Sequence, residues 1–123
     1  MLYDAAIRQL ARAVELLDSN NFLKKDPSKI EQISKAVMKA EEIITELIVS
    51  LDFEQGGDIS KNLFALYTWF NRELLEANIG HDMNRIKTVM EMLSDLRNTW
   101  NEVAGKYNAE SASREAVGLD IAG

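Results

Sequence analysis

The sequence predicts an all-α protein, an antiparallel up-down-up-down four-helix bundle with a flexible C-terminal tail. Four segments repeat apolar residues every three or four positions, which is the spacing of one helix face. The six Gly and the single Pro fall between these segments rather than within them. No stretch shows the strict alternation of a half-buried strand. Connections of roughly five to nine residues would place sequential helices antiparallel to one another.

The second segment carries the clearest stripe, and the first carries a shorter one. We expect the second to begin at Asp26-Pro27, a cap followed by Pro at the first helical position, with Ser28 and Glu31 as an alternative capping box. The stripe of the first segment is Leu2, Ala6, Leu10, Ala13 and Leu17. The stripe of the second is Ile30, Ile33, Val37, Ala40, Ile44, Leu47 and Leu51, a heptad-like pattern that suits the shallow crossing angle of a bundle.

The third and fourth segments repeat this pattern. We expect Gly80 to stop the third helix in a left-handed conformation, Asp82 to cap the fourth, and Gly105 to lie near its end. The third stripe is Leu63, Leu66, Phe70, Leu74 and Ala77, and the fourth is Ile86, Val89, Leu93, Leu96, Trp100 and Val103. Residues 1–107 would form one domain. Residues 108–123 hold few large apolar groups, which predicts a mobile tail.

Composition excludes several classes of function. Fourteen basic and twenty acidic residues give a net charge of −6, whereas nucleic acids and anionic membranes require a basic face. The longest uncharged apolar run, Ile48 to Leu51, is too short to span a bilayer, and Asp4 and Arg8 argue against a signal peptide. The absence of Cys fits a reducing compartment. We therefore expect a cytoplasmic protein without nucleic-acid binding or membrane insertion.

No pattern indicates catalysis, a metal or a cofactor. His81, the only His, follows Gly80 at a helix junction and is interpreted as a solvated cap residue. Three acidic residues lie close along the second helix but off its stripe, and we interpret them as a solvated face: Glu41, Glu42 and Glu46. No nucleophile elbow, phosphate loop or metal-ligand spacing is present. An enzyme is not expected.

The helices carry more apolar residues than one stripe requires. The additional residues are Ile7, Val14, Ile43, Ile48, Phe64, Tyr67, Trp69, Met83, Met90 and Met92. In one interpretation they fill the core, since helices facing a core use wide stripes. In the other they line a groove that receives an amphipathic partner helix, for which adaptable Met and aromatic side chains are suited. Periodicity alone leaves both open.

Five short pieces, in order along the chain, resemble the flagellar export chaperone family FliS. They are MLYDAAI at residues 1–7, LDFEQGG at 51–57, LFALY at 63–67, LLEANI at 74–79 and LRNTW at 96–100. The second resembles the central loop of the family and the third the start of its third helix. The resemblance covers roughly residues 1–103. Family members usually have a further N-terminal stretch that covers the groove, and the tail from Asn108 matches no family pattern.

The resemblance implies a cytosolic chaperone in type III flagellar export. Such a protein would bind the C-terminal segment of flagellin about one to one, prevent its premature polymerisation and keep it competent for export. An export-gate protein and an anti-sigma factor are further partners that it leaves open. The chaperone would be a monomer or weak dimer. The alternative is a structural or dimerising bundle without a flagellin client, in which the additional apolar residues form a self-interface.

The predicted client-binding groove combines large apolar residues in or beside the matching pieces. They are Tyr3, Ile7, Leu10, Val14, Phe64, Tyr67, Trp100 and Val103. The tail carries Val117, Leu119 and Ile121 at spacing two. We consider that it folds back over this groove, or over the groove of a neighbouring molecule, in place of the N-terminal cap, with a disordered tail as the alternative.

Overall fold

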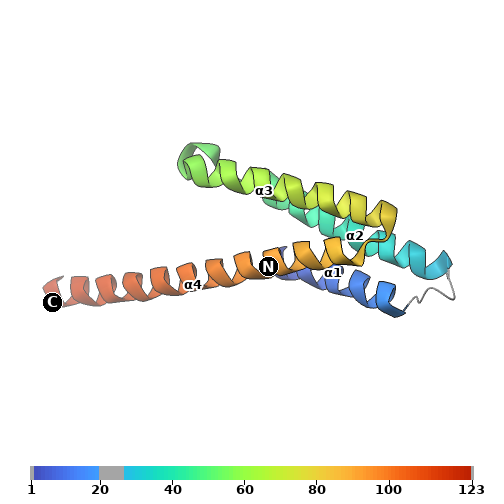
Figure 1. Cartoon of the computed structure of the whole chain (residues 1–123). Coiled ribbons are helices and arrows are strands. Elements are labelled where there is room, and N and C mark those ends of the chain that lie inside the picture. Colours follow the sequence, from blue (N-terminus) through green and yellow to red (C-terminus); the bar gives the residue numbers. More distant parts are fainter. Residues whose placement is uncertain (1, 20–26, 123) are drawn as a thin grey trace.

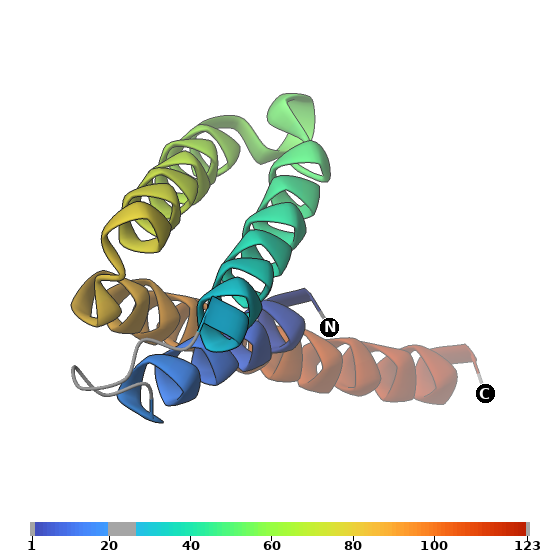
Figure 2. The same ribbon diagram turned by 90° about the vertical axis from the view of Figure 1, so that its right-hand side faces the viewer.

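A ring of four helices forms the bundle. The computed structural model describes residues 2–19 and 27–122, with side chains for residues 2–18 and 27–105. The helices are α1 (Leu2–Ser19), α2 (Pro27–Val49), α3 (Phe53–Gly80) and α4 (Met83–Ala122). Each packs against the next, and α4 packs against α1. Figures 1 and 2 show α2 and α3 side by side above α1 and α4. The predicted all-α up-down-up-down bundle is confirmed.

The predicted stripes supply most of the core. Ala36 and Tyr67 are buried beside the stripes, whereas the stripe residues Leu2 and Val103 are exposed. In α2 the five central stripe residues, from Ile33 to Leu47, are all buried. Phe70 is the largest fully buried side chain, and it lies beside the rings of Tyr67 and Trp69 with centroids 6.3 and 5.8 Å away. Among the side chains that the structure describes, the remaining buried apolar residues are Ala6, Leu10, Ala13, Ala36, Tyr67, Leu74, Ala77, Ile86, Val89 and Leu93. Burial of these faces is the main force that holds the helices together.

The segment resembling a central loop is mostly helical, which corrects the prediction. α3 begins at Phe53, ten residues before Leu63, because the Asp52 side chain accepts hydrogen bonds from the backbone N–H groups of Glu54 and Gln55 at 3.0 and 3.1 Å. Gly57 interrupts the helix with φ +50°, a conformation that favours Gly. The α2–α3 connection is therefore residues 50–52, shorter than expected.

Removal of the Asp52 cap should destabilise the bundle. We expect Asp52→Ala to lower the free energy of unfolding by about 1 kcal/mol, since two backbone donors lose their acceptor. Urea denaturation followed by circular dichroism measures this. Asp95→Ala, an exposed position within α4, is the matched control. Equal stability of Asp52→Ala and the control would show that the cap does not stabilise α3.

The junction between α3 and α4 is also tighter than predicted. His81, rather than Gly80, takes the left-handed conformation, with φ 52° and ψ 42°. Its backbone N–H and that of Asp82 both donate to Ala77 O. Asp82 caps α4 as predicted, accepting from the N–H groups of Asn84 and Arg85. Because Asp82 must start α4, the turn falls on the residue directly before it. His81 is thus an exposed cap residue, as expected.

The fourth helix is longer than predicted. It continues through Gly105 to Ala122 and extends well beyond the other three helices in Figure 1. One Gly costs a helix only about 1 kcal/mol relative to Ala, so it need not end one. Residues 108–122 are helical and project from the bundle, instead of folding back across it as an extended segment. Their mobility stays a prediction. The predicted cap Asp26 lies outside the described residues, whereas Pro27 is the first residue of α2, as predicted.

Candidate protein interaction surface

The eight predicted groove residues differ widely in exposure. Leu10 and Tyr67 are buried in the core, and Trp100 is half-buried. Three residues of α1 are partly buried and pack against the core: Tyr3, Ile7 and Val14. Only Phe64 and Val103 are exposed, at 44% and 51%. Most of the predicted set therefore presents little surface in this conformation, and the binding role of all eight stays a prediction.

A hydrogen-bonded aromatic cluster joins three of these residues across the bundle. The hydroxyl groups of Tyr3 in α1 and Tyr67 in α3 share a hydrogen bond, and Trp100 Nε1 in α4 donates to Tyr3 Oη at 3.0 Å. Burial and the hydrogen bond with Tyr3 raise the pKa of the Tyr67 hydroxyl. Hydrogen bonds between these neutral side chains therefore link α1, α3 and α4.

Polar residues in the matching pieces also link helices. Arg97 Nη1 donates to Asp4 Oδ1 at 3.0 Å and joins α4 to α1. Ser34 Oγ donates to Asn78 Oδ1 at 2.9 Å and joins α2 to α3. The pieces that resemble the family thus contain residues that set the positions of the helices, and no local spacing in the sequence reveals these pairs.

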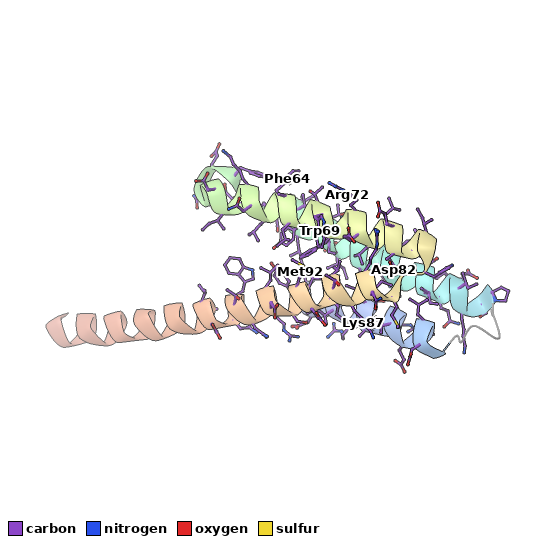
Figure 3. The ribbon with its side chains drawn as sticks, viewed as in Figure 1. Phe64, Trp69, Arg72, Asp82, Lys87 and Met92 are labelled. Carbon is purple, nitrogen blue, oxygen red and sulfur yellow. The ribbon has the colours of Figure 1, made fainter. Side chains whose placement is uncertain are left out.

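Exposed apolar side chains follow the outer side of α2 and α3. Met38 and Leu75 are each 53% exposed, and Val49 is 79% exposed. In Figure 3, Trp69 and Met92 lie between α3 and α4, whereas Phe64 lies on the side of α3 that faces away from α4. Phe53 packs edge-on against Phe64, with ring centroids 5.9 Å apart. We define the α2–α3 face as the exposed residues Met38, Val49, Phe64 and Leu75.

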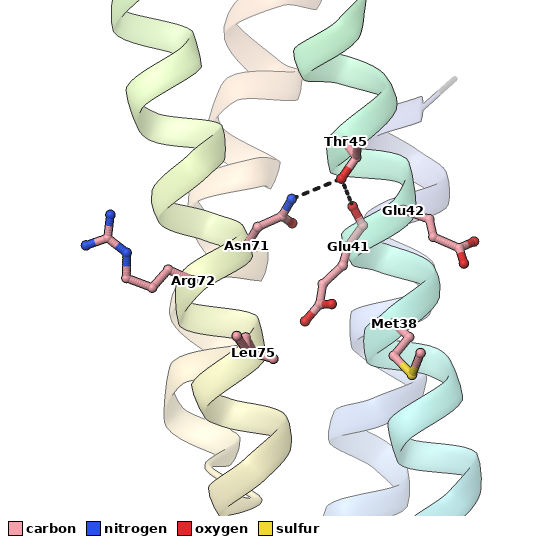
Figure 4. Close-up of a pocket in the computed structure, with 7 residues that line it drawn as sticks. All are labelled: Met38, Glu41, Glu42, Thr45, Asn71, Arg72 and Leu75. Carbon is pink, nitrogen blue, oxygen red and sulfur yellow. Dashed lines mark hydrogen bonds between the residues drawn. The ribbon is translucent and has the colours of Figure 1, made fainter.

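A groove between α2 and α3 runs along this face. Its volume is about 570 Å³, and it is lined by Met38, Glu41, Glu42, Thr45, Asn71, Arg72 and Leu75. Figure 4 shows Glu41, Asn71 and Leu75 directed toward the space between the helices, whereas Arg72 and Glu42 point outward. Phe64, Asn71 and Leu75 recur at steps of seven and four, so they share one side of α3. The sequence interpretation included Phe64 but missed Met38 and Val49, which lie outside the matching pieces, and Leu75, which lies in the piece at residues 74–79.

Glu41 is not part of a solvated face, which corrects the sequence interpretation. Its Oε1 atom is buried and has no hydrogen-bond partner, and the same is true of Asn71 Oδ1. Burial raises the pKa of the Glu41 carboxyl. Glu42 and Glu46 are exposed, as expected. Glu41 differs because it follows Ala40 of the core stripe, on the side of α2 that packs against α3.

Replacement of Glu41 should stabilise the bundle in a pH-dependent manner. Because the pKa is raised above 4.5 in the folded state, the folded protein binds this proton more tightly than the unfolded chain. The ionised carboxylate therefore destabilises the fold, fully above the raised pKa and not below pH 4.5. We expect Glu41→Gln to raise the free energy of unfolding at pH 7 more than at pH 4, measured by urea denaturation. An equal gain in Glu46→Gln would contradict this.

Among the residues that the structure describes, no group of three or more His, Asp or Glu side chains is placed to hold a metal ion. Within the same part of the chain, no helix is both long and apolar enough to cross a membrane.

Comparison with known proteins identifies the family. The sequence pattern of the family described as "Flagellar protein FliS" matches residues 1–107. The chain is 35% identical over 112 residues to the flagellar secretion chaperone FliS of Salmonella typhimurium, covering 91% of this chain and 78% of that protein. It is 33% identical over 102 residues to the flagellar secretion chaperone FliS of Escherichia coli, covering 83% of this chain and 70% of that protein. This chain belongs to the FliS family of flagellar secretion chaperones.

Proposed function

We propose that this chain binds the C-terminal helical segment of flagellin in the cytosol. Binding would cover the apolar face of that segment, prevent premature polymerisation and keep the segment competent for export. The family membership supports a chaperone for a flagellar secretion client and argues against an enzyme. We infer in addition that the client is flagellin and that it binds to the α2–α3 face.

The observation that carries the proposal is the exposed apolar α2–α3 face. A soluble monomer gains nothing from exposing a row of large apolar side chains, and such a row usually marks an interaction site. From Phe64 to Leu75 the face is about 16 Å long, at a rise of 1.5 Å per residue, which is enough for about three turns of a bound helix. The flexible Met38 side chain can adapt to different apolar partners, and the Phe64 ring offers a large apolar surface.

The ordering of a flagellin segment has a free-energy cost. A segment that folds on binding loses conformational entropy, so its chaperone must offer extended apolar area. The row of exposed residues on two neighbouring helices meets this requirement better than the Tyr3–Tyr67–Trp100 cluster. The cluster is already hydrogen-bonded and partly covered. We therefore propose that the main contact is on the α2–α3 face. Phe64 is the one residue that belongs both to this face and to the groove predicted from the sequence.

A mixing experiment tests the proposal against a self-associating bundle. Size-exclusion chromatography with light scattering should show the chain as a monomer or weak dimer. With a flagellin C-terminal peptide it should form a 1:1 complex. A stable homodimer that ignores the peptide would overturn the chaperone function and favour a self-interface on the α2–α3 face.

A further inference from the structure

Two hydrogen-bond acceptors in the groove point to the chemistry of its occupant. Glu41 Oε1 and Asn71 Oδ1 are both buried and both without a partner, and they come from facing helices. Buried polar atoms of native proteins nearly always have a partner, so two unpaired oxygens in one groove require an explanation. Neither can satisfy the other while Glu41 is ionised, since both can only accept.

The neighbouring hydrogen bonds fix the direction of the Asn71 amide. Thr45 Oγ1 donates its single proton to Glu41 O at 2.9 Å, and Asn71 Nδ2 donates to Thr45 Oγ1 at 3.2 Å. Because the Thr45 proton is already used, its hydroxyl oxygen can only accept from Asn71. The amide nitrogen of Asn71 must therefore face Thr45, which leaves Oδ1 directed away from Thr45 and into the groove (Figure 4).

The groove favours a cationic donor with an apolar stem. A carboxylate oxygen and an amide oxygen together match a group that carries several N–H donors and a positive charge. The neighbouring cation Arg72 points away from the groove and does not fill this role (Figure 4). Met38 and Leu75 are each 53% exposed at the groove, and the methylene groups of a Lys or Arg side chain can pack on such walls while the head reaches polar atoms.

We propose that the helix bound on the α2–α3 face inserts one lysine or arginine side chain between Met38 and Leu75. Its cationic head donates to Glu41 and Asn71 and compensates for the missing partners. This inference rests on the proposed function, because the helix is taken to belong to the flagellin C-terminal segment. Glu41 then selects the register of the client, since a helix that places an apolar or acidic residue at this point leaves Glu41 Oε1 buried and unpaired.

A charge-removal series tests the inference. Isothermal titration calorimetry with a flagellin C-terminal peptide should show affinity at least about tenfold weaker for Glu41→Gln than for the wild type, as expected when one partner of a buried charge pair is removed. Glu46→Gln changes the net charge equally at an exposed position of α2, and it should bind like the wild type. Each Lys and Arg of the peptide is also replaced in turn by Met, which keeps the stem and removes the charge.

The double-mutant cycle identifies the partner residue. One peptide substitution should weaken binding to the wild type by about the same factor as Glu41→Gln, and it should have little further effect in the Glu41→Gln protein. Wild-type affinity of the Glu41→Gln protein overturns the inference. The absence of any peptide position that is coupled to Glu41 overturns it as well. A wild-type chain that does not bind the peptide at all instead refutes the proposed function. Circular dichroism confirms that each variant is folded.

Discussion

The Phe64→Asp variant is expected to lose at least about 30-fold in affinity for the flagellin C-terminal segment, the effect of removing an interface side chain worth about 2 kcal/mol or more. Phe64 belongs to the exposed α2–α3 face, and a carboxylate there would be desolvated against an apolar client helix. Because the native side chain is 44% exposed, helicity and cooperative melting should remain near the wild type. Calorimetric titration and thermal denaturation measure the two properties.

Ala11→Asp is the control for this variant. It introduces the same charge at an exposed position of α1, in the layer opposite the α2–α3 face, and client affinity should not change. Equal losses in both variants would indicate a general charge effect. Unfolding of Phe64→Asp would show that Phe64 supports the core, as the wide-stripe interpretation of the sequence holds.

The Phe70→Ala variant is expected to lose about 3–5 kcal/mol in the free energy of unfolding, the range for removing a fully buried aromatic ring. Phe70 has no exposed surface and contacts the Tyr67 and Trp69 rings in the centre of the bundle. Total stability of a small domain is about 5–15 kcal/mol, so this loss would bring the bundle close to unfolding. Urea denaturation measures it.

Phe53→Ala is the stability control, since Phe53 is 47% exposed. We expect it to lose much less stability than Phe70→Ala, because the Phe53 ring is only partly buried and its removal leaves no internal cavity. A similar loss in both variants would contradict the assignment of the core to the four stripes. It would imply that the Phe53–Phe64 pair at the start of α3 supports the fold to the same degree.

Periodicity predicted the interior of each helix better than its ends. The stripe from Ile33 to Leu47 is buried as expected, because one helix face must be covered for the bundle to form. The residue at which a helix begins or ends depends on a few hydrogen bonds to its capping residues, and neighbouring candidate caps compete for this role. Asp52 starts α3 ten residues before the position that the family resemblance indicated, and Asp82 shifts the left-handed turn from Gly80 to His81. The spacing of apolar residues does not predict which of the neighbouring polar residues caps the helix.

The candidate interaction surface was harder to predict from the sequence than the fold. Phe64 and Leu75 both lie in matching pieces, but Leu75 directly follows the stripe residue Leu74 and was not selected. Met38 and Leu75 became notable only because they line the same groove between α2 and α3. The Tyr3–Tyr67 hydrogen bond joins residues 64 positions apart, and no local pattern encodes that contact. Glu41 was assigned to solvent because its position off the stripe does not reveal which neighbouring helix covers it.

Site-specific photo-crosslinking can show whether the client binds on the α2–α3 face. A photoreactive phenylalanine analogue is placed at Phe64, and in a second protein at Ala11, and each is irradiated with the flagellin C-terminal peptide. We expect a crosslinked 1:1 adduct from position 64 that excess unlabelled peptide suppresses, and no adduct from position 11. A specific adduct from position 11 without one from position 64 would contradict client binding on the α2–α3 face.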